Sequence, residues 1–179
     1  ADIDNVHDVW TTALSQRNAP ALLSMMPALS LYHDLTATWM IGETVFNASE
    51  PAFASTSPEV YGLWLSHMAL LASRLDHVEE AVRLAETCLS ILAARQAENV
   101  EAASRALMVR GIVEDTHGHH DKAEQYYCQA LHLRETVGDT WGCANCYINL
   151  AGAWARQGDF SKARQLAETG LTLGESLGS

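Results

Sequence analysis

Two cysteines three residues apart, Cys143 and Cys146, form the pattern in this sequence that comes nearest to a chemical site. Cys-X-X-Cys spacing occurs in zinc sites and in redox motifs, which depend on a stabilised thiolate. A structural zinc site needs four ligands, and no second pair of cysteines supplies the other two. The pair falls within a predicted helix, where small residues such as Cys88 and Cys128 suit close packing. We therefore expect Cys143 and Cys146 to be structural.

Three histidines, His117, His119 and His120, lie together at a predicted turn. Imidazole nitrogens bind several metals, so the cluster could collect an ion from solvent. No set of carboxylates or thiols stands at a fixed spacing from it, and we therefore expect no physiological metal site. The sequence alone leaves metal binding by these three histidines open.

Arg110 and Glu114 are four residues apart, which places them on one face of a helix. One interpretation is an exposed ion pair within that helix, worth about 0.3–0.5 kcal/mol. The alternative is a polar contact with a ligand, or a buried switch. We favour the ion pair.

Catalytic motifs are absent from the sequence. It contains no phosphate-binding loop, no Gly-X-Ser-X-Gly motif and no His-Glu-X-X-His motif. We therefore predict no catalytic residues, no cofactor and no enzymatic activity. A metal-dependent enzyme built on the histidine and cysteine clusters is the weakest alternative.

The composition narrows the class of partner. The 179 residues carry a formal net charge of −11, so the chain lacks the basic surface that nucleic acids and anionic membranes require. The most apolar stretch, residues 21–32, is too short to span a bilayer. No signal peptide is visible and the four cysteines form no disulfide framework, so we expect a reducing, cytoplasmic location. Five tryptophans recur at apolar positions, and we expect them to fill the core: Trp10, Trp39, Trp64, Trp141 and Trp154.

Internal repeats give the strongest evidence on the fold. Three segments align on one template, and their final alanines recur about every 40 residues: 76–81, 118–123 and 158–163. A small residue precedes each of these turns in the helix before it: Ala69, Gly111 and Ala151. Small residues at such positions let two helix backbones approach closely. The repeats therefore predict a stack of helix pairs, each of which buries its apolar face against the next.

The pattern resembles the tetratricopeptide repeat, which has Gly-Asp and an aromatic residue at the turn and an alanine in the second helix. The last repeat fits this template best, with Ala151, Trp154, Gly158, Asp159, Phe160 and Ala163. The middle repeat departs from it at Arg110 and Glu114. The resemblance implies an all-α fold, namely a right-handed α-solenoid of antiparallel helix pairs with about nine helices.

We expect residues 1–57 to form a divergent start and residues 58–179 to form three regular helix pairs, at 58–97, 98–138 and 139–179. The start would hold helices over about 3–16, 19–33 and 36–48, the second kinked or broken at Pro27. Residues 49–57, with Pro51 and several Ser and Thr residues, would be the most irregular segment. Gly138 and Gly158 would end helices with a positive φ.

In the tetratricopeptide repeat family, the first helix of each pair lines the ligand groove. Carried over to this sequence, the resemblance implies seven candidate contact residues: Arg74, Arg105, Met108, Asp115, Asn145, Ile148 and Arg156. This mixture suits an extended peptide or a helix, whose backbone Asn145 would bind. It lacks the dense basic set that holds an acidic C-terminus. The expected occupant is a protein, a peptide or a small inducer; the alternative is that several of these residues only cover the surface.

The long period also resembles the sensor regions of bacterial signal-transduction ATPases, including transcription activators similar to the maltose regulator. The opening residues 2–6, followed by Trp10, Ala13 and Leu14, look like the start of that region. This resemblance implies a ligand-sensing segment excised from a larger regulator. The alternative is a general peptide-docking adaptor without a switching role.

The last predicted helix carries four leucines that no following helix would cover: Leu166, Leu171, Leu173 and Leu177. The end of a helical stack needs a polar cap to stay monomeric. We therefore expect self-association through this helix.

Overall fold

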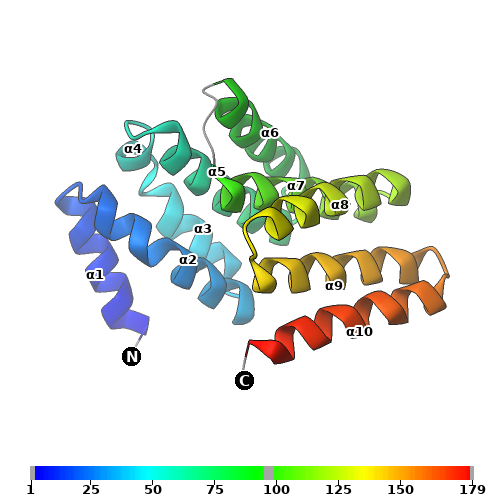
Figure 1. The fold of residues 1–179 in the computed structure, drawn as a ribbon. Helices are drawn as coiled ribbons and strands as arrows, with labels where there is room; N and C mark the ends of the chain where they lie inside the picture. Colours follow the sequence, from blue (N-terminus) through cyan, green and yellow to red (C-terminus); the bar gives the residue numbers. More distant parts are fainter. Residues whose placement is uncertain (1–2, 95–98, 178–179) are drawn as a thin grey trace.

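The computed structural model describes residues 3–94 and 99–177, which contain ten helices and no strand (Figure 1). The helices are α1 (Ile3–Ser15), α2 (Ala19–Leu35), α3 (Trp39–Asn47), α4 (Glu50–Phe53), α5 (Pro58–Arg74), α6 (Val78–Ala94), α7 (Val100–Thr116), α8 (His120–Thr136), α9 (Thr140–Arg156) and α10 (Phe160–Ser176). The all-α prediction is confirmed, with one helix more than expected in this part of the chain.

Two N-terminal segments differ from the prediction. α2 continues through Pro27, so it is not broken there, and the alternative of a kink stays a prediction. The proline is exposed, while Met26 and Leu29 near it are buried. The segment 49–57, expected to be irregular, contains the short helix α4. Pro51 occupies its second position, where the missing N–H has no helical acceptor, and Phe53 is fully buried.

Turns of three residues join most neighbouring helices. The middle residue of each has a positive φ: Arg17, Ala37, Asp76, Gly118, Gly138 and Gly158. The positive φ predicted for Gly138 and Gly158 is therefore confirmed. Asn and Asp side chains then cap several of the following helices; Asp139, for example, accepts a hydrogen bond from the Gly142 N–H at 2.8 Å. A tight turn followed by a cap returns the chain antiparallel to itself.

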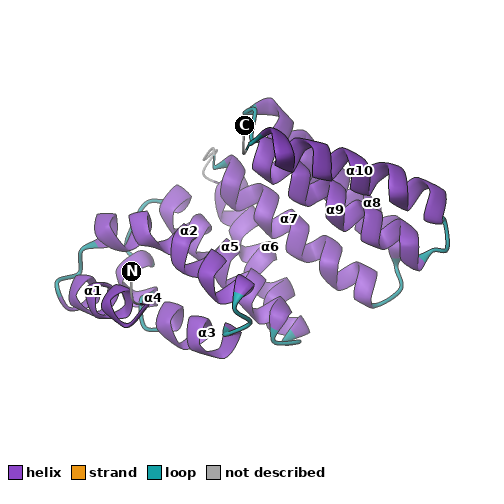
Figure 2. Ribbon diagram, turned by 90° about the horizontal axis from the view of Figure 1, so that it is seen from below, coloured by secondary structure: helices purple, strands orange, loops and turns teal. Residues whose placement is uncertain are grey.

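The six helices from α5 onward form two layers. The first helices of the pairs, α5, α7 and α9, contact one another in order, and α6, α8 and α10 pack against them. Figure 2 shows α7, α9 and α10 running alongside one another, with α1 to α4 gathered at the opposite end of the molecule. The exact division of the chain at residues 57, 97 and 138 stays a prediction, and the limit at 97 lies outside the described residues.

Close contacts between paired helices depend on the small residues of the repeat. A Cβ added to Gly111 of α7 would lie 2.3 Å from Cε1 of Tyr127 in α8, and Tyr127 is buried. The repeat alanines Ala81, Ala123 and Ala163 are also buried. The repeat pattern therefore marks the positions at which the two layers meet.

A tryptophan joins the N-terminal helices to the regular pairs. The Nε1–H of Trp64 in α5 donates to the Phe46 carbonyl oxygen at 3.2 Å and to Ser49 Oγ at 3.1 Å. Trp10 likewise donates to the Val45 carbonyl oxygen at 3.2 Å. Both rings are buried, as expected for core residues.

Within the described residues, no helix has the length and apolar character needed to cross a membrane.

The C-terminal helix α10 presents part of the predicted leucine surface. Leu171 and Leu177 are exposed, and Leu166 and Leu173 are half-buried. Self-association through this face stays a prediction.

Candidate functional site

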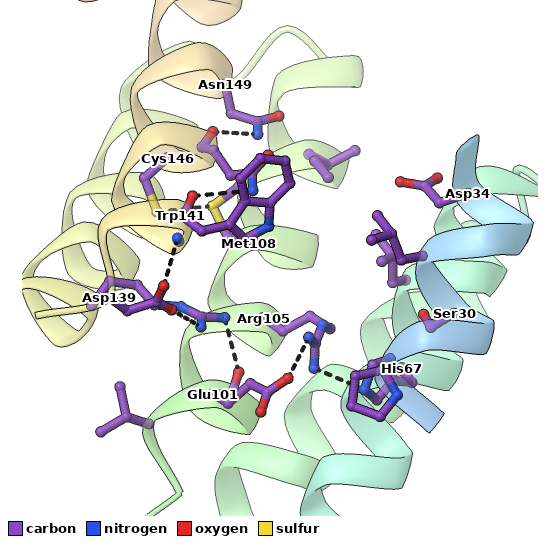
Figure 3. A pocket seen from close by; sticks show the side chains of 18 of the residues that line it. Ser30, Asp34, His67, Glu101, Arg105, Met108, Asp139, Trp141, Cys146 and Asn149 are labelled. Atoms are coloured by element: carbon purple, nitrogen blue, oxygen red, sulfur yellow. Dashed lines mark hydrogen bonds and ion pairs between the residues drawn. The ribbon is translucent and has the colours of Figure 1, made fainter. Parts of the chain in front are cut away.

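A groove with a volume of about 460 Å³ lies between α2 and the first helices α5, α7 and α9 (Figure 3). α2 supplies one wall, α5 and α7 supply the base, and α9 with the turn before it supplies the opposite wall. Its polar and charged lining residues are Ser30, Asp34, His67, Arg74, Glu101, Arg105, Arg134, Asp139, Asn145 and Asn149.

Four of the seven predicted contact residues line this groove: Arg74, Arg105, Met108 and Asn145. The other three lie outside it. Asp115 is buried, pairs with Arg156 and accepts a hydrogen bond from His120 Nδ1 at 2.8 Å. Ile148 lies near α10, where its Cδ1 would be 3.2 Å from a Cβ added to Gly170. The structure thus divides the predicted set among the groove, the Asp115–Arg156 pair, in which Asp115 is buried, and the exposed Ile148.

Arg105 occupies the base of the groove, and its side chain is only 17% exposed. Its Nη2 donates to Glu101 Oε1 at 2.8 Å, and its Nη1 lies 3.2 Å from His67 Nε2 and 3.3 Å from Ser66 Oγ. A guanidinium only donates hydrogen bonds, so Nε2 of His67 accepts and its proton resides on Nδ1. Burial, reinforced by the positive charges of Arg105 and Arg134, holds the pKa of His67 well below its ordinary value, so this buried ring is neutral at pH 7.

Two further arginines line the groove. Arg74 of α5 forms a bidentate pair with Asp34 of α2, at 2.7 and 3.1 Å. Arg134 pairs with Asp139, the cap of α9, and donates to the Glu101 carbonyl oxygen at 3.4 Å. The bidentate Arg74–Asp34 contact restrains both the distance and the orientation of α2 relative to α5. Arg134 links the cap of α9 to the backbone of α7.

Two asparagines one helical turn apart lie on α9. The Nδ2 group of Asn145 donates to the Trp141 carbonyl oxygen at 3.2 Å, and that of Asn149 donates to the Asn145 carbonyl oxygen at 2.9 Å. Because a carbonyl oxygen cannot donate, the amide nitrogen must face it in each case. Both Oδ1 atoms are then available as hydrogen-bond acceptors.

The sequence prediction missed the whole of the α2 wall and part of the α9 wall. Asn149 had a detectable signal, since it follows Asn145 by four residues and must share its helical face. Trp141 was expected in the core, but it is 56% exposed at the edge of the groove, so this prediction is wrong. Asp34 gave no signal, because its partner is 40 residues away in the sequence.

The pair of Arg110 and Glu114 lies outside this groove. Their side chains are 3.5 Å apart as predicted, but each is only 14% exposed, so the exposed pair expected from the sequence is wrong. Arg110 also pairs with Glu86 of α6, and its guanidinium lies 5.2 Å from the ring centre of Tyr126 in α8. The pair therefore belongs to contacts among three helices.

The cysteine and histidine clusters do not converge on one point. Within the described residues, no group of three or more His, Cys, Asp or Glu side chains has the arrangement of a metal site. His119 contacts Glu114 and His120 contacts Asp115, each at 2.8 Å. Cys143 and Cys146 are buried free thiols, and burial raises the pKa of Cys146 to about 12. A protonated thiol is a poor nucleophile and a poor metal ligand.

Comparison of the sequence with family models and curated proteins adds one match. A model described as tetratricopeptide repeat matches residues 143–177, within the last helix pair. No curated protein matches the chain.

Comparison with solved structures supports the fold over nearly the whole chain. BtubC (BKLC) from P. vanneervenii superposes with a TM-score of 0.74 at 16% identity, over 98% of this chain and 75% of that protein. The Rap protein complexed with Competence and Sporulation Factor gives a TM-score of 0.74 at 14% identity, over 88% of this chain but 43% of the Rap chain. A putative kinesin light chain of Podosopora anserina gives 0.61 at 14% identity, over 99% and 89%. The described residues therefore form a tetratricopeptide-like α-solenoid.

Proposed function

We propose that this protein recognises a peptide, or an exposed segment of another protein, in the groove between α2 and α9. The observation that carries the proposal is the pair of open amide oxygens on Asn145 and Asn149. Four residues of helix span about 6 Å, and two residues of an extended chain span about 6.6 Å. Alternate N–H groups of an extended peptide can therefore reach both oxygens.

Apolar side chains at the edge of the groove support the same proposal. Leu31 of α2, Val137 of the turn and Trp141 of α9 are all exposed and all line the groove. Exposed apolar residues that converge from separate elements are typical of interaction surfaces. They would take the side chains of the peptide while the asparagines bind its backbone. The Rap protein, solved in complex with Competence and Sporulation Factor, supports partner binding by this fold.

Matched aromatic substitutions test the proposal. Trp141 and Phe160 are exposed by 56% and 69%, and Phe160 does not line the groove. We expect Trp141→Ala to weaken binding of a fluorescein-labelled mixed nonapeptide pool by about tenfold or more, because aromatic anchors dominate such interfaces. Phe160→Ala should leave binding unchanged in the same anisotropy titration. Equal effects of the two substitutions, or no binding by the wild type, would overturn the proposal.

A narrower form of the proposal makes this groove the sensor of a larger signal-transduction ATPase, in line with the repeat period of about 40 residues. As a sensor, the groove would change the ATP hydrolysis rate of the full-length protein when a peptide binds. As a simple adaptor, it would bind the peptide without such an effect. Either role fits a reducing compartment such as the cytoplasm, because all four cysteines are free thiols.

A further inference from the structure

We infer that the groove selects apolar peptides that carry basic residues and discriminates against acidic ones. This inference rests on the proposed function and adds the charge class of the ligand. It follows from how the charges and hydrogen-bonding groups of the groove are already used within the chain.

Each arginine that lines the groove is already paired with a carboxylate of the same chain. The three pairs are Arg74–Asp34 at 2.7 Å, Arg105–Glu101 at 2.8 Å and Arg134–Asp139. His67, the remaining group that could carry a positive charge there, is buried and neutral. An acidic peptide would have to displace one of these internal carboxylates, and the displaced carboxylate would then lose its own partner. The groove therefore offers an anion no uncompensated cation.

Acceptor atoms, in contrast, remain open. Among the described residues, none donates a hydrogen bond to Asn145 Oδ1 or Asn149 Oδ1, since each amide uses its nitrogen within α9. Glu101 uses Oε1 for Arg105, and no residue in the described part of the chain donates to its Oε2. Figure 3 shows Glu101 between Arg105 and Asp139. A ligand rich in donors, such as lysine or arginine side chains, complements these three atoms.

Glu101 is the carboxylate best placed to hold a ligand cation. Its side chain is 39% exposed, against 26% for Asp34 and 27% for Asp139. Both oxygens of Asp34 and both of Asp139 are occupied by hydrogen bonds. The net charge of −11 on the chain attracts basic peptides at long range, and Glu101 would fix them at short range.

Three labelled peptide pools test the inference on the whole chain. The nonapeptides share mixed Leu, Phe and Trp positions, and the remaining positions are Lys and Arg, Ser and Asn, or Asp and Glu. We expect the basic pool to bind about tenfold more tightly than the acidic pool at low salt, and the difference to shrink as salt rises.

Two matched variants distinguish a specific contact with Glu101 from attraction by the net negative charge of the chain. Glu101→Gln removes the anchor and leaves Arg105 unpaired, so the preference for the basic pool should disappear. Glu80→Gln breaks a comparable intrahelical pair, Glu80–Arg83 at 2.8 Å, on the exposed face of α6. Both variants change the net charge equally, so Glu80→Gln should keep the wild-type preference. Asn145→Asp, which adds a negative charge beside the groove without altering the base, should strengthen binding of the basic pool.

The outcomes separate this inference from the proposed function. Tightest binding of the acidic or the neutral pool would overturn the charge preference and leave peptide recognition intact. Equal responses of Glu101→Gln and Glu80→Gln would also overturn it, because the attraction would then be non-specific. Binding of no pool would overturn both proposals.

Discussion

The N-terminal helices and the regular pairs are joined by turns of the same length, but different residue types occupy the middle position, where φ is positive. Among the described turns between α5 and α10, three of four place glycine there: Gly118, Gly138 and Gly158. In the N-terminal part, Arg17 and Ala37 adopt the same positive φ. A non-glycine residue in this region of backbone space costs about 1 kcal/mol or more. The packing of the helices therefore determines the positive φ of the turn, and glycine lowers the backbone strain that this conformation causes.

The two parts also differ in the regularity of their helices. Every helix from α5 to α10 has 17 residues, whereas α1, α3 and α4 have 13, 9 and 4. Equal lengths let each pair cover the next completely, while short helices leave more of the layer to loops. The regular part should therefore be the more tightly packed and the more sensitive to added volume.

Alanine at two buried glycines tests this difference in packing. A Cβ at Gly111 would lie 2.3 Å from Tyr127 Cε1, and one at Gly42 would lie 2.9 Å from His33 Cγ. We expect Gly111→Ala to lower the free energy of unfolding by about 2 kcal/mol and Gly42→Ala by about 1 kcal/mol. Urea unfolding at neutral pH measures both. A greater loss at Gly42 would show that the N-terminal part is packed as tightly as the regular part.

The pH dependence of stability tests which part contains the more strongly perturbed histidine. Burial lowers the pKa of His67 in α5 well below 6.5, and burial together with the charge of His7 lowers that of His33 in α2. The unfolded chain therefore binds protons more readily, so stability is complete above pH 6.5 and is lost as the pH falls below it. Because of His67 alone, the free energy of unfolding should fall by about 1 kcal/mol between pH 6.5 and pH 5.5.

Substitution of each histidine provides the corresponding control. Urea unfolding of His67→Gln should show less loss of stability between pH 6.5 and 5.5 than the wild type, and His33→Gln should show a smaller change. If His33→Gln removed more of the pH dependence, the N-terminal part would contain the dominant titrating group.

An exchange of turn residues gives the smallest expected effect. No heavy atom lies within 4 Å of a Cβ placed on Gly158, so Gly158→Ala adds backbone strain and no clash. We expect this substitution to lower the free energy of unfolding by about 1 kcal/mol, and Ala37→Gly to raise it by about 0.5 kcal/mol after the entropy of glycine in the unfolded chain is included. Thermal unfolding of both variants measures the difference. Destabilisation by Ala37→Gly would mean that the turn at Ala37 carries no strain.

The order of helices in the regular part could be predicted from the sequence. α5 and α6, α7 and α8, and α9 and α10 fall within the ranges predicted for the three pairs, because the repeated alanines and turn residues mark where each second helix begins. α4 could not be predicted, since Pro51 and the surrounding Ser and Thr residues favour a loop locally. Burial of Phe53 against the rest of the core outweighs that preference.

The groove could be predicted on one side only. Arg105 and Met108 follow from the resemblance to the tetratricopeptide repeat, in which the first helix of each pair lines the groove. The other wall comes from α2, which the repeat template does not cover. Arg74, which was expected to contact a ligand, lines the groove and also binds Asp34 of α2. Such a contact between distant segments depends on how the N-terminal helices pack, and no local pattern encodes it.

The two walls of the groove come from different parts of the chain, α2 from the N-terminal helices and α9 from the regular pairs. A peptide bound in the groove would therefore contact both parts at once. The N-terminal helices and the regular pairs can melt separately in a linear stack, where each unit contacts only its neighbours. A ligand that bridges them would couple the two transitions and merge them into one cooperative event at a higher temperature.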